Sequence, residues 1–138
     1  MTPDQMASLH AKLKHLSRPW SSKEYTKFME NTHSVCVIGE FGFCIGNIIQ
    51  TVAEISMILV EPRAHRQGFG SNYLKNFESQ VKKLGAKACF LEVSITNIPA
   101  QTLYFRNGFQ KVGSRKNYYR SLQGVREDGL ILKKSLDN

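Results

Sequence analysis

The stretch EPRAHRQGFG, residues 61–70, stands between a run of apolar β-forming residues, EISMILV at 54–60, and a segment with the periodicity of a helix. Pro62 has no backbone N–H to donate and therefore ends strand pairing, and Gly68 and Gly70 open the helix that follows. Such a turn leaves backbone N–H groups free at the positive end of the helix dipole. The stretch therefore predicts a strand, a turn and a helix that together form an anion-binding site.

Phosphate is the anion that this turn fits best. Gly68 and Gly70 carry no side chains that would clash with the oxygens of a bound phosphate. Positive charge is added by three neighbouring side chains, Arg63, His65 and Arg66. An alternative interpretation, in which the glycines only start a helix, stays open because such turns are common.

Two common phosphate-binding motifs do not match this turn. A nucleotide P-loop requires Lys and then Ser or Thr after its last glycine, but here Ser71 follows Gly70 with no lysine between them. A dinucleotide fingerprint requires a third small residue at the position of Tyr73 and a tight turn directly after the strand. We therefore exclude both motifs.

Outward from the turn, the hydrophobic pattern predicts alternating strands and helices. Strands are predicted at 33–40, 43–52, 54–62, 88–96, 110–114 and 129–133. Helices are predicted at 3–16, 21–30, 69–84 and 98–107. Ser21 or Ser22 caps the second helix, Gly85 ends the third, and Asn97 caps the fourth. Turns or bulges among the first strands are marked by Gly39, Gly42 and Gly46.

The helix predicted at 69–84 is amphipathic and sets the direction of the sheet. Its apolar residues are Phe69, Tyr73, Phe77, Val81 and Leu84, and its charged residues are Lys75, Glu78, Lys82 and Lys83. Because this helix separates two strands, the crossover is long enough to be right-handed and to make those strands parallel. The earlier strands follow one another through short turns and are antiparallel. The predicted fold class is α/β (α+β), with a mixed, mostly antiparallel sheet, a central parallel strand pair and helices on both faces.

Length and composition predict one domain, 1–138, in the cytoplasm. The 138 residues are enough to bury a hydrophobic core. The start, MTPDQMASLH, lacks the apolar core of a signal peptide, and no apolar run approaches the roughly 18 residues of a spanning helix, so we expect no membrane partner. Cys36, Cys44 and Cys89 form no CxxC pair, which is typical of reduced thiols, and we expect them to be buried. No histidine has metal-ligand spacing, so we expect no metal.

The charge predicts an anionic partner. The chain has 19 Lys and Arg against 11 Asp and Glu, a formal net charge of +8. Nucleic acid, a ribosome or a phosphorylated cofactor would each satisfy this excess of positive charge. Charge alone does not choose among them.

The turn resembles the signature of the GCN5-related N-acetyltransferases (GNAT), Q/R-x-x-G-x-G/A, which follows a strand and binds the pyrophosphate of coenzyme A. In this chain the signature runs over 65–70 as HRQGFG, with His65 where the family prefers Gln or Arg. Main-chain amides carry most of the binding at such a turn, so we expect His65 to be tolerated. The resemblance implies the GNAT fold and acetyl-CoA as the acetyl donor.

Four further stretches resemble the RimI type of this family, bacterial enzymes that acetylate the amino-terminal alanine of a small-subunit ribosomal protein. They are PWS at 19–21, LEVSITN at 91–97, LYFRNGF at 103–109 and RKNYY at 115–119. Glu127 and Asp128 match as well, and the resemblance extends over 19–132. It departs at the N-terminus, where the family begins with a strand and residues 1–13 are too short and too polar to supply one.

The resemblance implies Glu92 as general base and Tyr104 as general acid, the two proton carriers that acetyl transfer to an amine requires. From the residues alone, Glu92 interrupts an apolar strand and shares a face with Phe90 and Ser94, which fits a base but equally fits a solvated strand face. Tyr104, with an ordinary pKa near 10, suits proton donation to a thiolate. An aromatic residue in an amphipathic helix is, however, ordinarily part of the core.

The resemblance also implies which residues contact the two substrates. The family binds the thioester oxygen through a backbone N–H at the strand end, here among Ile58, Leu59 and Val60, with Val60 as the specific choice. The other implied cofactor contacts are His65, Arg66, Gln67, Gly68, Phe69, Gly70, Ser71 and Asn97. The implied acceptor contacts are Trp20, Glu54, Tyr118 and Tyr119. From the residues alone, Asn97 also fits a helix cap, Trp20 fits simple packing and Glu54 fits an ordinary strand end.

The stretch GSRKNYYR, residues 113–120, allows three interpretations. Its aromatic and basic residues suit stacking on RNA bases, a clamp for a peptide's amino terminus, or a basic surface turn. The family resemblance favours the peptide groove, so we expect a protein N-terminus as the partner and no direct nucleic-acid binding.

The ionisation of amines favours an α-amine as acceptor. An α-amine with a pKa of about 7.7 to 8 is on the order of a tenth neutral at pH 7, whereas a lysine near 10.4 is only about 0.04% neutral. We therefore predict an N-terminal protein acetyltransferase acting on the amino-terminal alanine of a small-subunit ribosomal protein. A lysine or small-amine acetyltransferase stays open, as does a basic ribosome- or RNA-binding module, although the pair Glu92 and Tyr104 speaks against the module. The sequence does not indicate an oligomeric state.

Overall fold

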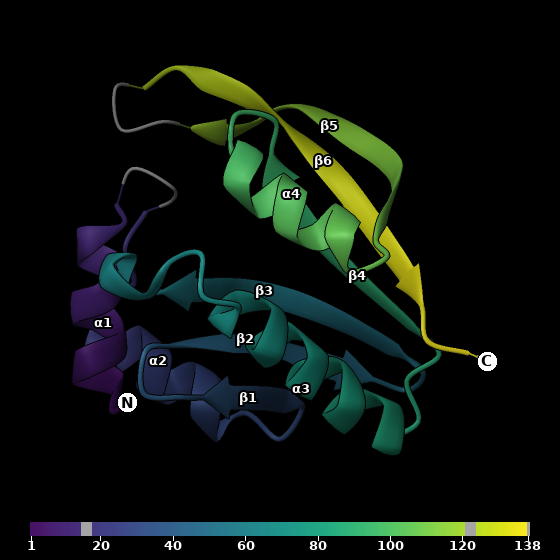
Figure 1. The fold of residues 1–138 in the computed structure, drawn as a ribbon, viewed down its shortest axis with the longest axis horizontal. Helices are drawn as coiled ribbons and strands as arrows, with labels where there is room; N and C mark the ends of the chain where they lie inside the picture. The colour runs from purple at the N-terminus through teal and green to yellow at the C-terminus, as the bar shows by residue number, and fades with distance from the viewer. Residues whose placement is uncertain (15–17, 121–123, 138) are drawn as a thin grey trace.

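The computed structural model describes residues 1–14, 18–120 and 124–137. Its helices are α1 (Pro3–Lys12), α2 (Ser22–Glu30), α3 (Phe69–Lys83) and α4 (Ile98–Arg106), with a 3-10 helix, η1, at Pro62–Ala64. Its strands are β1 (Ser34–Ile38), β2 (Gly42–Ile49), β3 (Val52–Val60), β4 (Ala88–Ser94), β5 (Gln110–Arg120) and β6 (Arg126–Ser135) (Figure 1). The predicted order of strands and helices is confirmed.

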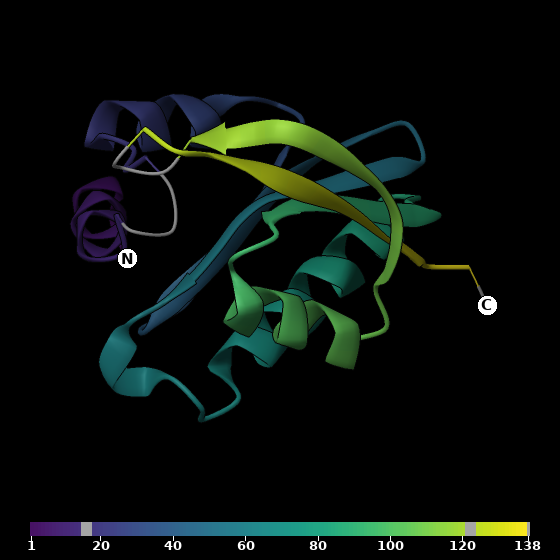
Figure 2. The same ribbon diagram turned by 90° about the horizontal axis from the view of Figure 1, so that it is seen from above.

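The strands form a mixed sheet in the order β1-β2-β3-β4-β6-β5. β3 and β4 run parallel because α3 crosses over between them, and the other neighbouring strands run antiparallel. α1 and α2 cover one face of the sheet, and α3 and α4 cover the other (Figure 2). The predicted α/β (α+β) fold, with a central parallel pair and helices on both faces, is confirmed.

The parallel strands separate soon after they pair. Among the described residues, β3 and β4 pair over 52–55 and 88–91, although both strands extend further. The register of β2 against β3 shifts between Ile45 and Gly46, which makes Ser56 an extra residue in β3. A β-bulge bends its strand, so β3 turns away from β4 at this point, as Figure 1 shows. We call the diverging segments, 56–60 and 92–94, the fork.

Each face of the sheet has its own apolar core. The core under α3 and α4 includes Leu74, Phe77, Val81, Leu91, Tyr104 and Leu132. The core under α1 and α2 includes Met6, Leu9, Tyr25, Phe43 and Ile45. Cys44 and Cys89 are buried and Cys36 is half-buried, all as free thiols. The fork therefore lies between two packed layers that fix the position of its strands.

The helix ends follow the capping residues. Ser21 caps α2 in a reciprocal pair with Glu24, and Asn97 caps α4, as predicted. Gly85, with φ of 102°, follows the end of α3. α1 ends at Lys12, earlier than the predicted residue 16, and the last residues of that prediction lie outside the described part of the chain.

Two side chains predicted for α3 are placed differently. Leu84, predicted on the apolar face, is 62% exposed because the helix ends before it. Glu78, predicted on the charged face, is 9% exposed and lies 3.0 Å from Nζ of Lys134. β6 brings this lysine over the helix, and a buried carboxylate requires such a partner.

The last two strands are longer than predicted. The sequence pattern predicts 110–114 and 129–133, whereas β5 and β6 cover 110–120 and 126–135. Their pairing has register shifts at Lys111–Gly113 and at Arg115–Tyr119. The extra residues of β5 interrupt the alternation of apolar and polar side chains, so the sequence pattern does not reveal the full strand. Its hydrogen bonds to β6 nevertheless continue on both sides of the irregular part.

A buried histidine joins α1 to the segment that precedes α2. Nδ1 of His10 accepts the backbone N–H of Trp20 at 2.9 Å and lies 2.8 Å from the hydroxyl of Tyr25. Because the Trp20 N–H can only donate, Nδ1 carries no proton. Burial is the main cause that lowers the pKa of His10 from 6.5 to about 4.

We expect His10 to make the protein less stable in acid. The pKa in the folded chain is lower than in the unfolded chain, so the unfolded state binds more protons between pH 6.5 and 4, and stability falls as the pH falls through this window. The free energy of unfolding, measured by urea titration, should drop by on the order of 2 kcal/mol over this range because of His10. His10→Gln should flatten the slope, and an unchanged slope would contradict this account.

Candidate active site

The end of β3 points backbone N–H groups into the fork. The N–H of Glu61 donates to the carbonyl of Phe41, just before β2, at 2.7 Å. Successive residues of a strand direct their backbone groups to opposite sides, so the N–H groups of Val60 and Ile58 point away from β2 and toward β4. Leu59 instead pairs with Phe43 of β2, and its side chain is buried against α1 and α2. Ile58 and Val60 can thus bind a ligand in the fork.

The turn from β3 to α3 has the geometry of an anion site. Gly68 and Arg66 adopt left-handed backbone conformations, with φ of 85° and 64°. α3 has no side-chain N-cap among the described residues, whereas α1, α2 and α4 each have one. Its first N–H groups, those of Phe69, Gly70 and Ser71, are left for a ligand or water. A Cβ at Gly68 would meet no protein atom within 4 Å, so the space beside these amides is open.

His65 closes the turn onto β3. Its Nε2 lies 2.7 Å from the carbonyl oxygen of Val60, and because that oxygen only accepts, Nε2–H is the donor. Gln67 donates from Nε2 to the carbonyl of Arg63 at 3.2 Å. The histidine that departs from the family signature therefore ties the anion-binding turn to Val60, whose N–H faces the fork.

α3 and α4 meet beside the turn. Asn107 donates from Nδ2 to Oγ of Ser71 at 3.2 Å. A Cβ at Gly70 would lie 3.3 Å from Cδ2 of Leu103 and 3.8 Å from Cγ2 of Val60. β3, α3 and α4 thus place an apolar wall next to the free amides, which suits a ligand with an anionic group and an apolar arm.

Phe69 and Asn97 fix the starts of the two helices. Phe69 is half-buried and packs on Phe41, with 4.8 Å between ring centroids. Oδ1 of Asn97 accepts the N–H of Ala100 at 3.3 Å, so the capping role predicted as an alternative is seen. The Nδ2 group of Asn97 is not used by this cap and can serve a ligand as well.

Glu92 directly follows the last residue of β4 that pairs with β3. Leu91 and Val93 point into the core under α3 and α4, so Glu92 lies on the other face. Its side chain is 22% exposed, and Oε1 lies 3.2 Å from Nε of Arg115. Within the described ranges this carboxylate has no second partner, so Oε2 is available to a substrate or a water.

Tyr104 lies on the opposite side of the sheet from Glu92. It is 6% exposed, belongs to the core under α3 and α4, and packs edge to face on Phe109 with 5.8 Å between centroids. Burial raises the pKa of Tyr104 well above its ordinary value, so the phenol stays protonated. In the part of the chain that the structure describes, its hydroxyl makes no hydrogen bond.

Tyr118 and Tyr119 lie at the irregular part of β5, near Glu92. Tyr118 is half exposed and meets Tyr119 edge to face, with 5.2 Å between centroids. Burial, together with the negative charge of Glu92, raises the pKa of Tyr119 to about 12. Tyr119 therefore presents a neutral phenol on the Glu92 side of the sheet, with the ring of Tyr118 beside it.

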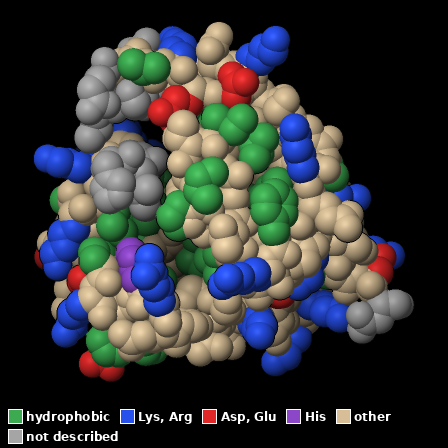
Figure 3. Space-filling model, turned by 45° about the horizontal axis from the view of Figure 1, so that its top comes forward, with side chains coloured by type: hydrophobic (Ala, Val, Ile, Leu, Met, Phe, Trp, Pro, Cys, Tyr) green, Lys and Arg blue, Asp and Glu red, His purple; other side chains and the backbone are tan. Residues whose placement is uncertain are grey.

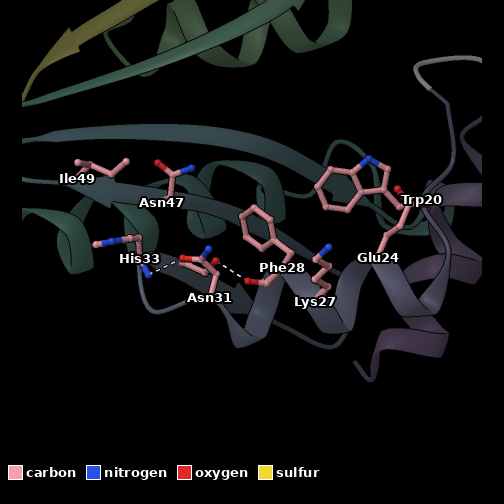
Figure 4. Close-up of a pocket in the computed structure, with 9 residues that line it drawn as sticks. Trp20, Glu24, Lys27, Phe28, Asn31, His33, Asn47 and Ile49 are labelled. Atoms are coloured by element: carbon pink, nitrogen blue, oxygen red, sulfur yellow. Dashed lines mark hydrogen bonds between the residues drawn. The ribbon is translucent and has the colours of Figure 1, made fainter.

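Trp20 and Glu54 lie on this same side. A groove of about 480 Å³ runs between α2 and the strands β1 and β2, with Trp20 at one end and Ile49 among its lining residues (Figure 4). Trp20 packs on Tyr25 and Phe28, with centroids 5.2 and 5.7 Å apart. Glu54 is exposed and pairs with Asn47, which lines the groove. The predicted acceptor contacts thus share a face, and among them Tyr118 and Tyr119 contact each other.

Sequence reasoning missed two side chains of the site. One is Arg115, the partner of Glu92. The other is Glu127, whose Oε2 accepts from Ser94 at 2.7 Å and from Thr96 at 2.8 Å, and so holds the end of β4. Both stand in stretches that carry the family resemblance, but no spacing in the sequence indicates these contacts.

One face of the molecule carries many basic side chains. On the face in Figure 3, Lys and Arg side chains surround a group of apolar side chains, in keeping with the net charge of +8. Among the described residues, no group of three or more His, Cys, Asp or Glu is placed to hold a metal ion. No helix in 1–14, 18–120 or 124–137 is long and apolar enough to cross a membrane.

Known proteins resemble this chain over most of its length. The model of the Acetyltransferase (GNAT) family matches residues 6–109. The ribosomal protein bS18-alanine N-acetyltransferase of Escherichia coli K12 is 30% identical over 135 residues, which is 95% of this chain and 90% of that protein. The Haemophilus influenzae protein of the same name is 32% identical over 106 residues, 77% of this chain and 68% of that protein.

A solved structure agrees with these relatives. The crystal structure of the ribosomal-protein-S18-alanine N-acetyltransferase from Escherichia coli superposes with a TM-score of 0.82 at 27% identity, covering 100% of this chain and 91% of that chain. The fork, the uncapped glycine turn and the carboxylate on β4 thus occur in a chain whose relatives transfer acetyl groups. The chain belongs to the acetyltransferase (GNAT) family and is an acetyl-CoA-dependent N-acetyltransferase.

Proposed function

We propose that this enzyme acetylates the amino-terminal α-amine of a protein, and that its acceptor is the N-terminal alanine of ribosomal protein bS18. The observation that carries the proposal is the similarity, over 95% of the chain, to an enzyme named for that acceptor. The carboxyl group of Glu92 at the fork, with the neutral phenol of Tyr119 beside it, supports an amine acceptor on that side of the sheet.

Acetyl-CoA supplies a thioester-bound acetyl group, and the turn before α3 would hold its pyrophosphate. The uncapped amides of Phe69, Gly70 and Ser71 support this assignment, because a helix N-terminus without a side-chain cap favours an anion. The open space at Gly68 leaves room for the phosphate oxygens. His65, Arg66 and Gln67 shape the turn, and Asn97 would add a contact at α4.

Three groups of this chain would carry the chemistry. Glu92 takes a proton from the acceptor amine, directly or through a water, as the nitrogen forms its bond to the acetyl carbon. The N–H of Val60 donates to the carbonyl oxygen on which negative charge develops. Tyr104 gives its phenolic proton to the departing sulfur as the carbon–sulfur bond breaks. Its raised pKa keeps that proton in place until the thiolate forms.

The acceptor would lie on the Glu92 face of the sheet. Tyr118, Tyr119 and Trp20 supply aromatic surface there, and Glu54 adds a carboxylate at the same face. A single glutamate suits an α-amine, on the order of a tenth neutral at pH 7, better than a lysine, of which only about 0.04% is neutral. These features support an extended amino terminus as the acceptor.

We expect Glu92→Gln to lose activity on a free amino terminus. Thiol release from acetyl-CoA would be measured with a peptide that starts with Ala and with the same peptide carrying a blocked amino terminus and an internal lysine. Wild type should turn over the free terminus, and the variant should lose about 100-fold or more in kcat/KM, the usual contribution of a general base. Turnover of the lysine peptide would identify a different acceptor, and unimpaired turnover by the variant would remove Glu92 from the mechanism.

Tyr104→Phe should lower kcat by about 10-fold or more and leave the thermal midpoint nearly unchanged, because the hydroxyl makes no hydrogen bond within the described residues. Tyr73→Phe is the matched control, since Tyr73 is also a buried helical tyrosine and its hydroxyl accepts the N–H of Phe41. This control should keep kcat within about twofold of wild type. Equal kcat in both variants would refute the acid role of Tyr104.

Gly68→Ala should weaken coenzyme A binding. A Cβ there would project into the open space beside the α3 amides, so the Kd from calorimetry should rise on the order of tenfold, about 1.4 kcal/mol. Gly85→Ala is the control, because Gly85 also has positive φ and an open surrounding but lies at the other end of α3. Both variants should lose similar stability from backbone strain. Equal Kd values would place the pyrophosphate elsewhere.

A further inference from the structure

Arg115 and Glu92 form an ion pair across a strand that separates them. β6 lies between β4 and β5 in the sheet, and its Gly129 pairs with Ser94 on one side and with Arg115 on the other. Neighbouring strands are about 4.8 Å apart, so the backbones of β4 and β5 are separated by about 10 Å. Nε of Arg115 nevertheless lies 3.2 Å from Oε1 of Glu92. The guanidinium therefore reaches across β6.

Gly129 makes this crossing possible. A Cβ at Gly129 would lie 2.9 Å from Cε2 of Tyr119 and 3.6 Å from Cδ2 of Tyr118. The first of these distances is shorter than a carbon–carbon contact allows. Gly129, opposite Arg115, thus adds no side chain to this face of β6, and both tyrosine rings occupy the space there, whereas Ile131 is the β6 residue opposite Glu92.

The irregular part of β5 fixes the direction of Arg115. Arg115 pairs with Gly129 and Tyr119 with Glu127, so β5 has extra residues between them. Asn117, with φ of 54°, donates its N–H to Oδ1 of Asp128 at 2.9 Å, which anchors this bulge. The guanidinium of Arg115 lies 4.9 Å from the ring centroid of Tyr118. The cation–π contact with Tyr118 therefore holds the guanidinium of Arg115, and the anchored bulge holds its backbone.

We propose that Arg115 is a positioning residue for acetyl transfer, which holds Oε1 of Glu92 and leaves Oε2 to receive the proton of the acceptor amine. This inference rests on the proposed role of Glu92 as the base. A carboxylate fixed at one oxygen has less rotational freedom to lose when the substrates bind, which raises the rate of the chemical step. The pair contributes little to stability, because the two side chains are 52% and 22% exposed.

Steady-state kinetics with an Ala-starting peptide tests this role. Arg115→Met should lower kcat on the order of tenfold, keep the KM for acetyl-CoA within about twofold, and leave the thermal midpoint within about 2 °C of wild type. Arg115→Lys should recover part of the lost kcat, because the ammonium group can still reach the carboxylate. Lys111→Met removes the same charge from an exposed site on β5 and should behave as wild type. An unchanged kcat in Arg115→Met would overturn the proposal.

A double-mutant cycle separates positioning from a general structural effect. If Arg115 acts through Glu92, then adding Arg115→Met to Glu92→Gln should reduce kcat no further than Glu92→Gln alone. If Arg115 acts on the fold or on another group, Arg115→Met should lower kcat by the same factor in wild type and in Glu92→Gln. The second result would overturn the proposal.

A measurement without turnover tests the contact itself. The Nε–H signal of Arg115 in an ¹H–¹⁵N NMR spectrum, assigned by its loss in Arg115→Lys, should shift in Glu92→Gln and stay unchanged in Lys111→Met. An unchanged Nε–H signal in Glu92→Gln would overturn the positioning role. Absence of wild-type turnover on the Ala peptide would instead overturn the proposed function, so the two failures are distinguishable.

Discussion

The separation of β3 from β4 after Ile55 and Leu91 is the constraint on which the site depends. If the parallel ladder continued, it would use the N–H groups of Ile58 and Val60, and the strands would close over any ligand. The bulge at Ser56 prevents this by bending β3 away from its neighbour. The backbone N–H groups at the end of β3 then have no partner in β4. Because a buried N–H group requires a hydrogen-bond partner, a ligand or water must bind these groups. The cores on both faces keep the strands apart.

The fork also divides the chemistry between the two faces of the sheet. On the α3 and α4 side lie backbone amides, an apolar wall and the protonated phenol of Tyr104, which suit the donor. On the other side lie Glu92, Arg115 and exposed aromatic surface, which suit a charged acceptor. An acid and a base in direct contact would share their proton. Glu92, the proposed base, and Tyr104, the proposed acid, stand on opposite faces of the sheet, so the two groups do not share a proton directly.

Local signals in the sequence predicted much of this arrangement. The caps Ser21 and Asn97, the turn with Gly68 and the crossover that makes β3 and β4 parallel depend on neighbouring residues or on one segment length. The errors concern contacts distant in sequence. The sequence pattern predicts Glu78 as a surface residue, because it does not show that β6 places Lys134 next to it. The far end of β5 escaped prediction because its bulges break the period of two on which strand prediction depends, and the start of β6 pairs with that irregular part of β5.

The same reasoning explains why the site was predicted in part. Glu92 and Tyr104 stand in stretches that carry the family resemblance. The contact of Arg115 with Glu92 instead depends on the order β4-β6-β5 and on a register that places Gly129 opposite Arg115. Glu127 and Asp128 are adjacent in sequence but act on different elements: Glu127 binds Ser94 of β4, and Asp128 anchors Asn117 of β5. Two successive carboxylates on β6 thus fix the end of the strand that bears Glu92, the proposed base, and the bulge next to Arg115, its partner. The geometry of the Arg115–Glu92 pair therefore depends on β4, β5 and β6 together, and no single stretch of the sequence predicts it.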